Sequence, residues 1–180
     1  KTGRLNAKPK IEINSYYGIQ STSRKLDLLN ATEYATIKNE MFAMGGLPMP
    51  FNNPQMGVGT NWQDSVFQKA PVHSHNISMT GGSSNTKYSL GVGYFTQDGI
   101  VGGPKSHFSR YNARLNLSTD LSKKLKLNSV FLFSNDYRNT LPENGIGSVL
   151  YNTINAFPNE PIKTPDGNYS YLDEVSDIIN

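Results

Sequence analysis

The sequence predicts an all-β chain, namely an antiparallel segment of a transmembrane β-barrel with about five strands and a short helix in its first long loop. Five stretches alternate apolar and polar residues with a period of two, as strands with two different faces do. The links between these stretches are alternately short and long. Charged residues make up only 17% and aromatic residues 11% of the 180 residues, which fits neither a helical bundle nor a disordered chain.

Composition also excludes several classes of function. The chain has no cysteine, which excludes disulfide scaffolds, thiol catalysis and cysteine-based zinc sites. Its net charge is +3, and the one dense basic cluster is Lys123, Lys124 and Lys126, so we expect no nucleic-acid partner. The first residues are rich in Lys, Gly and Pro, and the last ones form no closing element, so we expect a piece of a longer protein.

The alternating stretches place the strands near residues 10–20, 71–81, 86–97, 108–119 and 124–136. Each is close to the ~9–11 residues that cross a bilayer when a strand is tilted. Equal parity within the strands predicts one apolar, lipid-facing side, made of Ile11, Ile13, Leu90, Val92, Leu115, Leu117, Leu125 and Phe131. The opposite side is predicted to face the barrel lumen or a plug, and its candidate residues are Arg110, Asn112, Arg114 and Asn116.

The links differ in length in the way that outer-membrane barrels require. Residues 81–86 and 119–124 make short links, whereas the links at 21–71 and 97–108 and the segment after 136 are long. Outer-membrane barrels have short periplasmic turns and longer external loops. Because such links join neighbours, we expect the strands to form one antiparallel meander.

A helix is predicted near residues 31–44, inside the first long link. Asn30 followed by Glu33 has the spacing of a capping box, and the pair Gly45–Gly46 ends the helix. Shorter helical turns are predicted within 61–69 and 146–157.

A soluble β-sandwich that binds carbohydrate is the alternative, because sandwich strands also alternate polar and apolar residues. Two observations favour the barrel. The polar side carries Asn, Ser, Gly and Arg rather than the mixed Lys and Glu of a solvent-facing surface. Tyrosines also lie toward strand ends, as in the aromatic girdles of membrane barrels: Tyr17, Tyr88, Tyr94 and Tyr111.

Short motifs follow one another along nearly the whole chain. They are KPKIE at 8–12, YYGIQ at 16–20, LLNATEYA at 28–35, TNWQD at 60–64, HNIS at 75–78, GGS at 81–83, QDGIV at 97–101 and RYNARLN at 110–116. No single motif is specific, but the ordered series resembles the SusC/RagA family of TonB-linked outer-membrane transporters.

The resemblance implies a plugged barrel of about 22 strands. Residues 1–180 would be the N-terminal part of that barrel, without the plug domain and the remaining strands. It also implies import of oligosaccharide or peptide nutrients across the cell outer membrane. The implied partners are a SusD-like surface lipoprotein that forms a lid, TonB through the plug region, and outer-membrane lipid. No cofactor is implied.

Trp62, Phe51 and Met56 in the first long link are candidate contacts for a substrate or partner. An exposed aromatic side chain can stack on a sugar ring or pack against a protein. The alternative is that Trp62 anchors its own loop.

We expect neither catalysis nor a metal site. The carboxylates of Asp98, Asp136 and Glu143 are scattered, whereas a glycosidase needs two that flank one bond. His73 and His75 share one side of a strand, but no third ligand lies nearby in the sequence.

Overall fold

The computed structural model describes residues 3–142 and 145–170 and separates the chain into two compact units. The first unit comprises Lys1–Ser21 and Lys69–Thr140 and contains the β-sheet. The second unit comprises Thr22–Gln68 and Leu141–Asn180, and its described residues form three α-helices.

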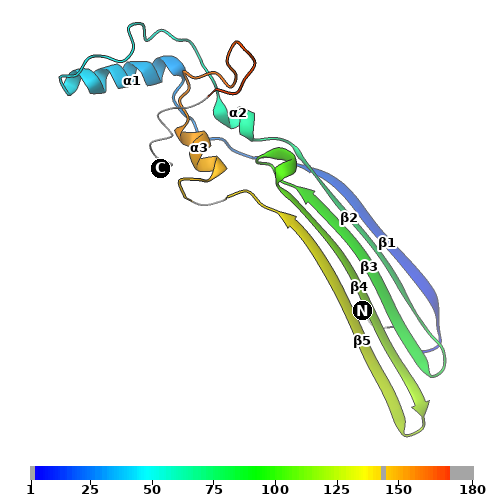
Figure 1. Cartoon of the computed structure of the whole chain (residues 1–180). Helices are drawn as coiled ribbons and strands as arrows, with labels where there is room; N and C mark the ends of the chain where they lie inside the picture. The colour runs from blue at the N-terminus through cyan, green and yellow to red at the C-terminus, as the bar shows by residue number, and fades with distance from the viewer. Residues whose placement is uncertain (1–2, 143–144, 171–180) are drawn as a thin grey trace. The chain divides into compact units, whose positions relative to one another are not determined.

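Five strands form one antiparallel sheet in which each strand pairs with its neighbour in sequence (Figure 1). They are β1 (Ala7–Gln20), β2 (Ala70–Gly82), β3 (Thr86–Asp98), β4 (His107–Ser122) and β5 (Leu125–Asn139). The predicted all-β class and the meander are therefore confirmed. Some strands run further than the alternation indicated: β1 begins before residue 10, and β5 continues past residue 136. Backbone hydrogen bonds between strands also form at polar residues, where the alternation of apolar and polar side chains does not predict that the strand continues.

The short links collect at one end of the sheet and the long links at the other. Residues 83–85 join β2 to β3, and residues 123–124 join β4 to β5. At the opposite end, Gln20 pairs with Ala70 and Asp98 pairs with His107. The link between β3 and β4 contains a single 3₁₀ turn, η1 (Gly103–Lys105).

The helix predicted in the first long link is present as α1 (Ala31–Met44). Its capping box is complete, because the Glu33 amide donates to Asn30 Oδ1 at 3.0 Å and the Asn30 amide donates to Glu33 Oε2 at 2.9 Å. Two shorter helices follow, α2 (Trp62–Val66) and α3 (Val149–Asn155). In the described part of the chain, none of the helices has the length and the apolar character needed to cross a membrane.

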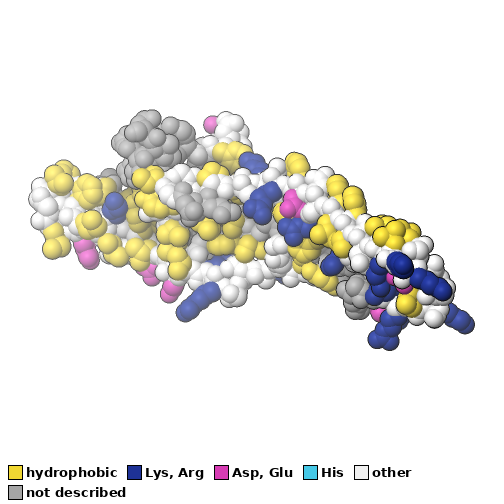
Figure 2. Space-filling model, turned by 90° about the horizontal axis from the view of Figure 1, so that it is seen from below, with side chains coloured by type: hydrophobic (Ala, Val, Ile, Leu, Met, Phe, Trp, Pro, Cys, Tyr) yellow, Lys and Arg dark blue, Asp and Glu magenta, His cyan; other side chains and the backbone are white. Residues whose placement is uncertain are grey.

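Neither unit contains a core of large apolar side chains within the described residues. The buried apolar residues there are Ala31, Ala35 and Ala70, and no large side chain is fully buried. All described strands longer than an isolated bridge belong to one sheet, so no two-sheet β-sandwich is formed by them. Figure 2 accordingly shows apolar side chains exposed at many points of the surface.

Candidate functional site

The pairing of the strands brings apolar residues from all five strands onto one face of the sheet, the apolar face. One row across the sheet consists of Ile11, Met79, Leu90, Leu115 and Phe131. The next row consists of Ile13, Ile77, Val92, Ala113 and Phe133. Leu117 lies opposite Tyr88, and Leu125 shares the parity of Phe131 along β5, so both also lie on this face. The eight residues predicted to share a face do so, and their contact with lipid stays a prediction.

A row of aromatic rings borders the apolar rows on the side of the long links. His75 stacks on Tyr94 with 6.4 Å between ring centroids, and Tyr94 stacks on Tyr111 at 4.7 Å. In the adjacent row, Tyr17 meets His73 edge to face at 4.5 Å. Tyr94 and Tyr111 lie several residues inside their strands rather than at the ends, because the strands continue beyond the apolar rows. Such a row matches the aromatic girdle of a membrane barrel.

The four predicted lumen residues lie together on the opposite, polar face of the sheet. Arg110, Asn112, Arg114 and Asn116 alternate along β4 with the residues of the apolar face. Arg110 Nε donates to Asp136 Oδ1 on β5 at 2.8 Å, a contact that follows from the direct pairing of these two residues. Whether a plug or a passing solute contacts this face stays a prediction.

Gly93 leaves room on the polar face for the side-chain amides of two neighbouring asparagines. It pairs with Asn76 on one side and with Asn112 on the other. A Cβ atom on Gly93 would lie 2.6 Å from Asn76 Oδ1 and 2.8 Å from Asn112 Oδ1, so a larger residue would displace both amides. The alternation of Gly91 and Gly93 in the sequence is the signal for this close approach.

A cluster of Phe and Arg side chains lies on the polar face toward the long links. Phe95 and Phe108 have ring centroids 5.9 Å apart. The guanidinium carbons of Arg110 and Arg138 lie 5.1 Å and 5.3 Å from the centroid of Phe108. Sequence reasoning missed Phe108 and Arg138, because only the pairing of β4 with β5 sets them opposite each other.

The three candidates in the first long link do not converge on one surface. Trp62 is half-buried, and its indole N–H donates to the Phe157 carbonyl at 2.9 Å. Phe51 is held by Asn39, whose Nδ2 donates to the Phe51 carbonyl at 2.8 Å and whose Oδ1 accepts from the Phe51 amide at 3.0 Å. Met56 is 43% exposed. For Trp62 the structure therefore agrees with the anchoring alternative, while contact with a substrate remains a prediction.

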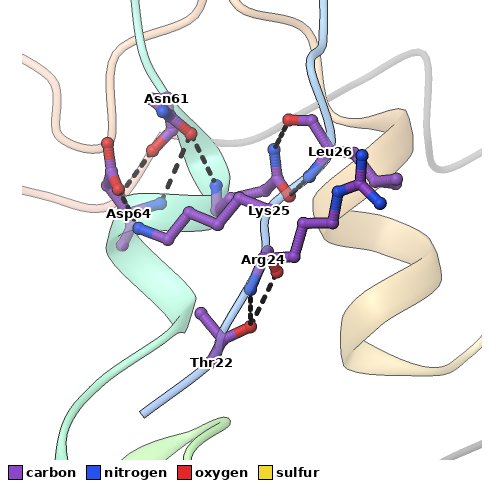
Figure 3. A network of polar contacts seen from close by, with 8 residues as sticks. Thr22, Arg24, Lys25, Leu26, Asn61 and Asp64 are labelled. Carbon is purple, nitrogen blue, oxygen red and sulfur yellow. Dashed lines mark hydrogen bonds and ion pairs between the residues drawn. The ribbon is translucent and has the colours of Figure 1, made fainter.

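The second unit contains a pocket of about 480 Å³, lined by residues of 26–30, α1, 58–63 and 153–158. Trp62 lines this pocket, whereas Phe51 and Met56 do not. Figure 3 shows the polar network that fixes part of the wall. In this network Lys25 pairs with Asp64, and the Gln63 side chain accepts from the Leu26 amide at 2.9 Å and donates to its carbonyl at 2.7 Å.

Within residues 3–142 and 145–170, no group of three or more His, Cys, Asp or Glu side chains is arranged to hold a metal ion. Asp98 Oδ1 is hydrogen-bonded to His107 Nδ1 at 2.6 Å. Asp136 Oδ1 accepts a hydrogen bond from Arg110 Nε.

Comparison with known proteins bears on the resemblance directly. No family model matches the chain. The chain is 34% identical over 176 residues to TonB-dependent receptor P26 of Formosa agariphila, and 26% identical over 175 residues to TonB-dependent receptor SusC of Bacteroides thetaiotaomicron. These alignments cover 97% and 95% of this chain. The predicted relationship to the SusC/RagA family is confirmed.

The SusC/RagA-like fold is also found among solved structures. The RagAB peptide transporter superposes with a TM-score of 0.75 at 20% sequence identity, and the RagAB peptide importer in its 'open-open' state with 0.77 at 17%. Each match covers 96% of this chain and 23% of the solved chain. The chain spans 17% of the length of receptor P26 and 16% of SusC, so it corresponds to about a sixth of these relatives. Their names describe receptors, not enzymes.

Proposed function

We propose that this chain forms the first five strands of the barrel of an outer-membrane, TonB-dependent importer of oligosaccharide or peptide nutrients. The observation that carries the proposal is the two-faced sheet, which is a single layer and has no core of large apolar side chains among the residues that the structure describes. Its apolar face includes Ile11, Ile13 and Phe131, each about 60% exposed or more (62%, 69% and 59%). A face of this kind is stable against lipid, whereas monomers in water expose much smaller apolar patches.

The polar face supports the same proposal from the other side. Asn and Arg side chains bordered by two glycines suit the polar interior of a barrel. In the proposed importer, Arg110, Asn112, Arg114 and Asn116 contact the plug or the passing solute. The short turns then face the periplasm, and the long links of the second unit face the outside.

The partners proposed for the complete receptor follow from the family resemblance. TonB would act through the plug region of the complete receptor. A SusD-like lipoprotein would cover the external side, where Trp62, Phe51 and Met56 are candidate contacts. The structurally similar RagAB is called a peptide importer, whereas oligosaccharide remains the other candidate substrate class.

The test uses the full-length receptor in its own cell. Membrane fractionation is expected to recover it in the outer membrane, and nutrient uptake is expected to stop when either the receptor or TonB is deleted. Recovery in the soluble fraction would refute the proposal, as would uptake that is unchanged without TonB.

An experiment on the isolated segment distinguishes the barrel hypothesis from the alternative, a soluble carbohydrate-binding module. Residues 1–180 expressed without detergent are expected to aggregate, because β1 and β5 are the edge strands of the described sheet and many of its apolar side chains are exposed. A compact monomer in sedimentation, with a sharp thermal transition, would favour a soluble module instead.

A further inference from the structure

The pocket of the second unit has walls that are fixed by hydrogen bonds between distant segments. The Thr60 amide donates to the Pro158 carbonyl at 2.8 Å, and the Ala31 amide donates to the Val58 carbonyl at 3.0 Å. Gly59 lies where these segments cross, with a φ of 70°, and a Cβ atom there would collide with the Pro158 carbonyl and with Ala31. The pocket is therefore formed by the fold itself, as small-molecule sites usually are.

The polar side chains in the wall are largely used by the fold. Trp62 Nε1 and both ends of the Gln63 amide bond the backbone. Thr153 Oγ1 donates to the Val149 carbonyl at 2.6 Å, and Asn155 Nδ2 donates to the Tyr151 carbonyl at 2.8 Å. A sugar ring needs many uncommitted donors and acceptors, because each hydroxyl group that loses water must be satisfied.

Apolar side chains make up most of the surface that remains for a ligand. Leu28 is 41%, Leu29 46% and Ile154 43% exposed, and all three line the pocket together with the rings of Tyr34 and Trp62. A volume of about 480 Å³ is enough for a bulky side chain and the short backbone that carries it.

Two opposite charges complete the lining. Asp27 and Lys38 both line the pocket, and Lys38 Nζ lies 5.7 Å from the centroid of the Tyr34 ring. Across the described ranges, neither Asp27 nor Lys38 has an ion-pair partner within 4.0 Å. An apolar pocket that presents one cation and one anion is complementary to a peptide, which carries an ammonium group, a carboxylate and apolar side chains.

We propose that this pocket binds a short peptide through a bulky apolar side chain, with Lys38 facing a peptide carboxylate and Asp27 a peptide ammonium group. The inference rests on the proposed import function and names the substrate class that this function leaves open.

The test measures binding to the purified full-length receptor by isothermal titration calorimetry with Gly-Leu-Gly, Gly-Ser-Gly and maltotriose. Gly-Leu-Gly is expected to bind at least about tenfold more tightly than Gly-Ser-Gly, because only leucine buries a large apolar surface. Maltotriose is expected to bind more weakly than Gly-Leu-Gly. Ile154→Ser should weaken binding of Gly-Leu-Gly about fivefold or more, and Leu28→Ser repeats this test in a segment that is neither helix nor strand.

Met44→Ser is the matched control, because Met44 is 90% exposed on α1 and does not line the pocket. It should leave the affinity for Gly-Leu-Gly unchanged. Lys38→Gln should weaken binding of Gly-Leu-Gly but not of its C-terminal amide, which separates a charge contact from a general loss of structure.

Equal binding of the two tripeptides would overturn the proposal, and so would tighter binding of maltotriose. Absence of peptide binding, as when another loop of the receptor fills the pocket, would overturn it as well. TonB-dependent uptake that persists alongside any of these results would leave the import function standing. Loss of outer-membrane location would refute the import function itself.

Discussion

Leu115→Arg tests which face of the sheet contacts lipid, and the adjacent residue provides its control. Leu115 lies at the centre of the apolar rows, between Leu90 of β3 and Phe131 of β5. Asn116 is the next residue of β4 and lies on the polar face, opposite Ser89 and Val130. Asn116→Arg therefore introduces the same side chain in the same strand with the opposite orientation.

The expected magnitude follows from the position of Leu115 between the row that holds Tyr88 and the aromatic row that holds Tyr111. Leu117, which pairs with Tyr88, is two residues away, and Tyr111 is four residues away. At about 3.3 Å per residue these rows are roughly 7 Å and 13 Å distant along the strand. Leu115 thus lies within the apolar band, where an arginine costs about 2–4 kcal/mol. That cost corresponds to a decrease of about 30-fold to several hundredfold in the folding equilibrium constant. Asn116→Arg should cost less than about 1 kcal/mol, because the polar face already carries Arg114.

Both variants are made in the full-length receptor. The assay compares their amounts in the outer membrane and the temperature at which each loses its folded mobility in gel electrophoresis. Leu115→Arg is expected to lower both, while Asn116→Arg stays close to the wild type. Equal behaviour of the two variants would refute the assignment of the faces, and a greater loss for Asn116→Arg would reverse it.

Three further substitutions test local features of the two units in the full-length receptor. Gly81→Val should destabilise the β2–β3 hairpin, because a Cβ atom on Gly81 would lie 2.6 Å from the Tyr88 hydroxyl oxygen; thermal unfolding measures this, and an unchanged midpoint would contradict it. Gln63→Ala should lower the free energy of unfolding by about 1–3 kcal/mol, because the Leu26 amide and carbonyl lose their hydrogen-bond partners. Proteases should therefore cleave the first long link faster in this variant than in Lys25→Ala. Asn30→Ala should destabilise α1 by about 1 kcal/mol through loss of its N-cap, and hydrogen exchange of α1 amides that matches the wild type would disprove it.

The features that local patterns encode could be predicted from the sequence. Alternation with a period of two identified five strands and assigned Leu115 and Arg114 to opposite faces, because parity along a strand determines the side on which a residue lies. The capping box of Asn30 and Glu33 identified α1, because both of its hydrogen bonds form within one helical turn.

Contacts between distant segments could not be predicted in this way. Arg110 meets Asp136, and Arg138 lies opposite Phe108, only because β4 and β5 pair in one particular register. That register includes a shift between Asp120 and Ser122, which no hydropathy pattern reveals. Trp62 was recognised as a candidate, but its hydrogen-bond partner Phe157 lies 95 residues further along the chain. The pocket is equally non-local, since its lining residues come from 26–30, α1, 58–63 and 153–158.

The strand β5 shows how the two faces and the edge of the sheet bear on the same conclusion. Every residue of β5 is exposed, and apolar side chains occur on both of its sides: Phe131 and Phe133 on the apolar face, and Val130 and Leu132 on the polar face. An edge strand of this composition in water would be a template for aggregation, and soluble proteins protect such edges with charge, proline or a covering segment. In a closed barrel no edge remains, because the next strand takes up the free backbone groups of β5. Val130 and Leu132 would then lie between neighbouring side chains of the barrel interior, and Phe131 and Phe133 would face lipid. The same strand that makes a free-standing sheet untenable therefore fits the wall of a barrel.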